Sequence, residues 1–204
     1  MPSITQGEAQ TILRPYLSKL RSSILEPVNR YFSGPELALF RNKLSKRSDA
    51  SNCHDLVVDC IKDCFDGVPK TRFIYKNKLF LLVIEERVVL RFKMFDQNRL
   101  GHGISTQQLI KLNYQEIEQL ELPDMPPDGL LHVGYCINAL RTGIESIHIT
   151  YRHGNHNLWE WNITESEMNN VQQIAFTQEA TTRQRRRRPQ PKNKNVGDVV
   201  NENS

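Results

Sequence analysis

The sequence predicts an α+β protein with N-terminal helices, a mainly antiparallel sheet of five or six strands, a C-terminal helix and a disordered basic tail. Two patterns support this class. Up to about residue 66, apolar residues recur every three or four positions, as on one face of a helix. From residue 71, short runs of β-branched and aromatic residues alternate with turn residues, as in strands. We expect a helical region over 1–68, a sheet domain with flanking helices over 69–180, and the tail over 181–204.

Three helices are expected in the N-terminal region. The first begins after Thr5 as its N-cap. Pro27 is expected to end or kink the helical segment that continues from it. The second opens at the sequence SGPELALF, where Ser33 can act as the cap and Pro35 suits the first turn. The third includes residues 53–65, whose apolar stripe carries cysteines as small core residues.

The second half of the chain contains six strand-like runs. Glycine-containing, hairpin-sized turns join the last three runs, which indicates a β-meander. A short helix capped by Ser105 or Thr106 is expected between the two groups of strands, and a capping-box spacing at Thr164 predicts a last helix to about Ala180. The six runs are residues 72–75, 79–84, 88–95, 130–138, 144–151 and 157–163.

The stretch LPDMPPDG at 122–129 precedes the first strand of the meander. Pro123, Pro126 and Pro127 fix backbone angles and lack three amide donors, so neither a helix nor a central strand can continue there. Gly129 then frees the chain to enter the strand. We interpret the stretch as a structural turn.

The formal charge of +4 is unevenly distributed. The tail from residue 183 holds seven cations and two anions, which leaves −1 for the first 182 residues. Such an arm can contact nucleic-acid phosphates or an acidic partner, or it can be a solvated tail. Its cations are Arg183, Arg185, Arg186, Arg187, Arg188, Lys192 and Lys194.

The four cysteines contain no C-x-x-C pair, and the N-terminus lacks the apolar stretch of a secretory signal. The longest apolar run, residues 79–84, is too short to cross a bilayer. We therefore expect a cytoplasmic protein with reduced thiols and no transmembrane segment.

Metal and catalytic motifs are weak. His132, His148, His153 and His156 lie in the meander and could form a two- or three-histidine metal site, or they could be ordinary histidines of its polar face. The chain contains neither a phosphate-binding P-loop nor a G-x-S-x-G nucleophile motif. We expect no cofactor, and the sequence favours a non-enzymatic role without deciding it.

The segment from Arg91 to Ile163 resembles a group of small bacterial proteins. The matching elements are RFKMFDQNRLGHGISTQQ, a Leu-Pro-x-x-Pro-Pro turn, a Gly-Tyr strand and a final strand with tryptophan, together about 70 of 204 residues. Such proteins are encoded beside ImmA/IrrE-type peptidases that are fused to a helix-turn-helix domain, as in RosmerTA-like modules. The resemblance implies one component of a toxin–antitoxin-like or phage-defence pair, with the helix-turn-helix peptidase as its protein partner.

Three functions are thus considered. The first is the interaction component that the resemblance implies. The second is a nucleic-acid-binding module that uses the basic arm of the tail. The third is a metal-dependent hydrolase that uses the histidines of the meander.

Overall fold

The computed structural model describes residues 4–76, 79–101, 103, 106–115, 126 and 129–165. These residues lie within one compact unit, Met1–Ser166. The predicted C-terminal helix and the whole basic arm fall outside the described residues, as do Pro123 and Pro127.

The α+β class is confirmed by a helical N-terminal part and a six-stranded, mostly antiparallel sheet. The helices are α1 (Gln6–Leu13), α2 (Leu17–Ser33), α3 (Pro35–Arg41), α4 (Lys46–Phe65) and α5 (Gln107–Asn113), and a 3-10 turn (Arg14–Tyr16) joins α1 to α2. The strands are β1 (Thr71–Lys76), β2 (Leu79–Ile84), β3 (Val88–Met94), β4 (Leu130–Ile137), β5 (Ile144–His153) and β6 (His156–Asn162).

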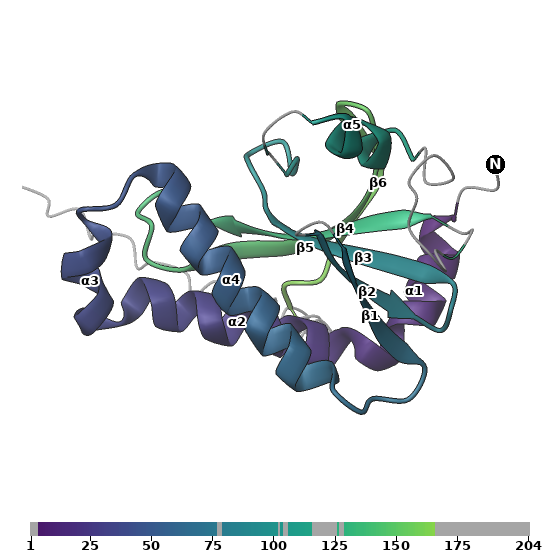
Figure 1. The fold of residues 1–204 in the computed structure, drawn as a ribbon, viewed down its shortest axis with the longest axis horizontal. Coiled ribbons are helices and arrows are strands. Elements are labelled where there is room, and N and C mark those ends of the chain that lie inside the picture. Colours follow the sequence, from purple (N-terminus) through teal and green to yellow (C-terminus); the bar gives the residue numbers. More distant parts are fainter. Residues whose placement is uncertain are drawn as a thin grey trace, which may run out of the picture. The chain divides into compact units, whose positions relative to one another are not determined.

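The strands follow one another in the sheet in their sequence order, β1 to β6. All neighbours are antiparallel except β3 and β4, which run parallel in the register Val89 to Leu130 and Met94 to Tyr135. A parallel neighbour cannot be reached through a tight hairpin, so the chain makes a long crossover between these two strands. Helix α5 belongs to this crossover and lies on the side of the sheet away from α2 and α4 (Figure 1).

The helix ends agree with the sequence in part. Thr5 caps α1 in a full capping box with Glu8, as predicted. The prediction that Ser33 caps the next helix was wrong: Gly34 is the N-cap of α3, and the Ser33 hydroxyl instead donates back to the Asn29 carbonyl at 2.6 Å.

Pro27 does not end its helix, because α2 continues from Leu17 to Ser33. The buried face of the helix continues past the proline: Ile24, three residues before it, and Val28, directly after it, are both fully buried. Burial of this face offsets the loss of one backbone hydrogen bond, which explains why the helix extends past Pro27.

One hydrophobic core includes residues of α1, α2, α4 and all six strands. On β3 to β6 the core contains alternate apolar residues, which share one face of the sheet: Leu90, Phe92, Leu131, Val133, Tyr135, Ile147, Ile149 and Tyr151 are buried, and Trp159 and Trp161 pack against them. The predicted boundary at residue 68 separates helices from strands, and both sets contribute to this core.

The opposite face of the sheet, which we call the second face, is also covered. A smaller cluster there joins Leu112 of α5 to apolar residues of β1 to β4. The Gln115 side chain, just after α5, bonds both backbone groups of Leu130 and the Arg152 carbonyl at 2.8–3.0 Å. The crossover is thereby fastened to the start of β4 and the end of β5.

Gly134 of β4 provides a test of packing on the second face. A Cβ atom at this position would lie 2.3 Å from the Phe95 ring, which packs directly on the glycine. We expect Gly134→Ala to lower the free energy of unfolding by about 1–3 kcal/mol, because the buried ring has to move. Urea titration measures the change. Gly7→Ala in α1 is the matched control: nothing lies within 4 Å of its added Cβ, so it should raise stability by up to about 1 kcal/mol.

Candidate functional site

The second face carries a group of buried basic side chains that we call the cationic cluster: Arg91, Lys93, His132 and Arg152. Arg91 of β3 is paired with His132 of β4, which is paired with Thr150 of β5. Lys93 lies two residues after Arg91 on the same face, and Arg152 lies two residues after Thr150. The strand register therefore brings four basic residues from three strands together.

The members of the cluster are held differently. Arg152 donates to the carbonyls of Gly154 and Gly101 at 2.7 and 2.9 Å. Lys93 packs its aliphatic carbons against the Gly101 backbone. In the described part of the chain, neither Arg91 nor Lys93 has a carboxylate partner within ion-pair distance. The central cations are therefore buried without compensation from a described acid.

Unpaired polar atoms accompany these cations. His132 is 2% exposed and Thr150 is fully buried, yet His132 Nε2 and Thr150 Oγ1 have no hydrogen-bond partner among the described residues. The same holds for Nδ1 of His148, the residue paired with Gly134. Buried polar atoms without partners are rare in folded proteins, and here three occur side by side.

Burial lowers the pKa of all four cluster members, and repulsion between cations adds to this effect at Arg91, Lys93 and His132. Burial, then Arg152, lower the pKa of Arg91 to about 10. Burial, then Arg91, lower the pKa of Lys93 to about 8. Burial, followed by the charges of Arg91, Arg152 and Lys93, lowers the pKa of His132 well below 6.5, so that this imidazole is neutral at physiological pH.

Two carboxylates border the cluster. Asp96 follows β3 and accepts from the backbone amides of Asn98 and Leu100 at 2.8 and 2.9 Å. Glu160 of β6 is opposite Thr150 and pairs with Arg99 at 2.9 Å. Both acids thus have partners outside the cluster, and Asp96 in addition favours the charged form of Arg152. Arg91 and Lys93 receive no such support from a described acid.

A pocket of about 350 Å³ opens beside Lys93. Ser51 and His54 of α4 line one side, and Lys93 and Phe95 line the other. Burial, then the charges of Lys93 and other neighbours, lowers the pKa of His54 to about 4. The pocket adjoins the cluster through Lys93 and has enough volume for a small organic group.

A different feature lies at one end of the unit Met1–Ser166, where α3 meets the turn between β4 and β5 (Figure 1). Leu39 is 77% exposed, Phe40 55% and Leu140 83%. We call these three residues the apolar end. Leu39 and Phe40 belong to α3 and are exposed, because this short helix projects past the sheet.

Buried charges support the apolar end. The Asp49 carboxylate accepts from the Tyr31 hydroxyl at 2.7 Å and pairs with Arg41 and Arg141. Arg41 also donates to the carbonyls of Phe32 and Arg141, at 2.9 and 3.3 Å. Burial, then the bond to Asp49, raises the pKa of Tyr31 to about 12. This network connects α2, α3, α4 and the β4–β5 turn.

The structure places the four histidines of the predicted metal site in two separate parts of the meander. His132 and His148 share the second face of adjacent strands, but they face Thr150 and Gly134 rather than each other. His153 and His156 lie together at the β5–β6 turn, with ring centroids 5.9 Å apart. Over the described residues, no three histidine, cysteine, aspartate or glutamate side chains are grouped so as to hold a metal ion.

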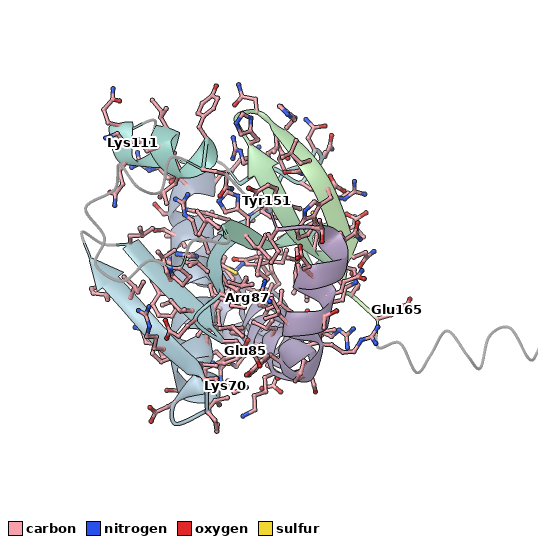
Figure 2. The ribbon with its side chains drawn as sticks, turned by 90° about the vertical axis from the view of Figure 1, so that its right-hand side faces the viewer. Lys70, Glu85, Arg87, Lys111, Tyr151 and Glu165 are labelled. Carbon is pink, nitrogen blue, oxygen red and sulfur yellow. The ribbon has the colours of Figure 1, made fainter. Side chains whose placement is uncertain are left out.

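The other predicted positions are described in part. Gly129 has a positive φ of 122° directly before β4, as a turn glycine can adopt, and Pro126 is buried. Glu85 and Glu86, between β2 and β3, pair with Lys70 and Arg72 at 3.6 and 2.7 Å. Lys70 and Glu85 lie beside each other in Figure 2. The four cysteines are free thiols.

The sequence interpretation missed the cationic cluster. Arg91 and Lys93 look like solvent-facing residues of a strand with one polar face, and Arg152 looks like part of a turn. Their burial follows from the crossover that covers the second face, which a strand pattern does not reveal. The available signal was the pair of cations within the otherwise apolar run VVLRFKMF.

Comparison of the chain with protein families, curated proteins and solved structures found no match. None of the helices in the described ranges is both long enough and apolar enough to span a membrane.

The neutral state of His132 predicts a pH effect on stability. In the unfolded chain this residue takes up a proton as the pH falls through about 6.5, whereas the folded protein keeps it neutral. The unfolded state then binds more protons, so the free energy of unfolding should fall between about pH 6.5 and pH 5. Urea titrations across this range should give a shallower decline for His132→Gln, by at most about 1.4 kcal/mol per pH unit.

His156→Gln is the control for this measurement, because His156 is exposed at the β5–β6 turn. It should keep the wild-type pH dependence. An unchanged slope in His132→Gln would show that the buried imidazole takes up its proton equally in both states.

Proposed function

We propose that the protein works by binding another protein through its apolar end, as the interaction component of a toxin–antitoxin-like or phage-defence pair. The observation that carries this proposal is the exposure of Leu39, Phe40 and Leu140 at one end of the fold. Exposed leucines are common singly, but large apolar side chains gathered at one site are typical of protein-binding surfaces.

The charged network of Asp49, Arg41 and Arg141 beneath these side chains supports the proposal. Asp49 is 6% exposed and bridges two arginines, one of which follows Phe40 and the other Leu140 in the sequence. Removing Asp49 would leave the largely buried Arg41 without this carboxylate, so the geometry of the network is strongly specified. The apolar side chains are therefore presented by a rigid base, which lowers the entropy lost on binding.

The surrounding charge favours an acidic partner. Residues 37–48 contain four cations and no acid. Three of these cations, Lys43, Lys46 and Arg47, are exposed and follow Phe40 within seven residues of the sequence. We infer a partner surface with apolar side chains bordered by carboxylates, because complementary charge accelerates association and excludes other partners.

The resemblance of residues 91–163 to proteins encoded beside helix-turn-helix peptidases supplies the class of partner. A peptidase of that type is the first candidate to test. The cellular role would then be exerted through the complex, without a reaction catalysed by this chain.

The test is co-expression of the full chain with the helix-turn-helix peptidase encoded beside its gene, with affinity measured by calorimetry and growth scored for each protein alone and together. We expect a complex. Leu140→Glu should weaken it by about tenfold or more, because it places a carboxylate in an apolar contact and opposes the acidic rim of the partner. Its stability should stay near wild type, since Leu140 is 83% exposed.

Leu158→Glu makes the same change on β6, at a residue that is 53% exposed and outside the apolar end. It should bind as tightly as wild type. The proposal is overturned if no such neighbouring gene exists, if the pair does not associate, if Leu140→Glu binds normally, or if the apolar end binds nucleic acid instead of the peptidase.

A further inference from the structure

We infer that the cationic cluster is a binding site for a phosphate group, either free phosphate or the phosphate of a small organic molecule. The site lies on the second face and uses Arg91, Lys93, His132 and Thr150. The inference is independent of the proposed protein partner, whose surface is formed by other residues.

The first step in the argument is the unbalanced charge. Arg91 is 8% exposed, and in the described part of the chain no carboxylate pairs with it. A buried cation without a partner destabilises the fold, and an apolar residue of similar size would serve the packing better. A ligand anion accounts for the residue, because it supplies the missing negative charge.

The second step is the supply of hydrogen-bond donors. Thr150 Oγ1 and His132 Nε2 are buried and unpaired among the described residues, and each can carry a hydrogen. The Arg91 guanidinium offers a planar fork that matches two phosphate oxygens, and the Lys93 ammonium adds a point charge. One tetrahedral anion can accept from all four groups.

The third step is the distance that the side chains have to span to contact one phosphate. Adjacent strands are about 4.8 Å apart, and alternate residues of one strand are about 6.6 Å apart. Arg91 is paired with His132 across one strand spacing, and Lys93 is two residues from Arg91. Long flexible side chains at these spacings can converge on a single phosphate.

The fourth step is the size of the ligand. His132 is 2% exposed, so the backbone of a nucleic-acid duplex cannot enter beside it. The ligand is therefore restricted to a compact anion. The pocket of about 350 Å³ that Lys93 shares with His54 and Phe95 adjoins the site and can take the organic part of a small phosphate ester.

The experiment measures the thermal midpoint of the full chain in sodium phosphate, and in sodium chloride of equal ionic strength. Phosphate should raise the midpoint in a concentration-dependent way, because it binds only the folded state. Arg91→Met should lose most of this response and bind phosphate about tenfold or more weakly in calorimetry. Without phosphate, its midpoint should rise by roughly 2–4 °C, since the uncompensated charge is gone.

Arg72→Met is the matched control, because it removes an arginine whose partner is the exposed Glu86 on another part of the sheet. It should keep the full phosphate response. If Arg91→Met does not fold, Lys93→Met provides the same comparison. Adenosine monophosphate is the second ligand: tighter binding than phosphate would identify an organic phosphate, and equal or weaker binding would identify free phosphate.

The inference is overturned if phosphate stabilises the wild type no more than chloride does. It is also overturned if Arg91→Met retains the phosphate response, or if that variant folds with a lower midpoint in chloride, which would indicate a purely structural role. The two ideas can fail separately. A protein that forms the complex but does not bind phosphate contradicts only this inference, and a protein that binds phosphate but forms no complex contradicts only the proposed function.

Discussion

The parallel pairing of β3 with β4 is the constraint on which the rest of the structure depends. It requires a crossover between Met94 and Leu130, and α5 on this crossover packs Leu112 against Val89 and Leu130 on the second face. The sheet consequently has cover on both sides, which is unusual for a largely antiparallel sheet. A face that would otherwise meet water becomes an interior surface, and the basic residues on it become buried charges.

The fold handles buried charge in two opposite ways. At the apolar end, the buried Asp49 carboxylate pairs with two arginines and accepts from the Tyr31 hydroxyl, and the result is a rigid support for exposed side chains. In the cationic cluster, Arg91 and Lys93 have no such counterpart in the described part of the chain. The ion pairs of Asp49 hold the local geometry of the apolar end, whereas the buried cations of the cluster favour the binding of an anion.

Local patterns were sufficient to predict the elements but not their neighbours. The Thr5 cap, the six strands and the shared apolar face of β4 to β6 are encoded in residues close together in the sequence, so they could be predicted. The parallel pair, the burial of His132 and the exposure of Leu39 depend on contacts between distant segments. The histidines could be recognised from their residue type alone. The importance of Arg91 and Lys93 depends on their position beside His132 in the sheet, which the sequence pattern does not show.

The Gln115 amide bonds the amide and carbonyl of Leu130 and the carbonyl of Arg152. The side chain of Gln115 therefore fixes one end of the segment that leads into β4, and this attachment does not depend on how many residues lie between Gln115 and Leu130. Closing a longer loop adds little entropy loss, about 0.6 kcal/mol for each doubling of its length. A change in the number of residues between Gln115 and Leu130 should therefore cost less stability than the loss of the Gln115 side chain.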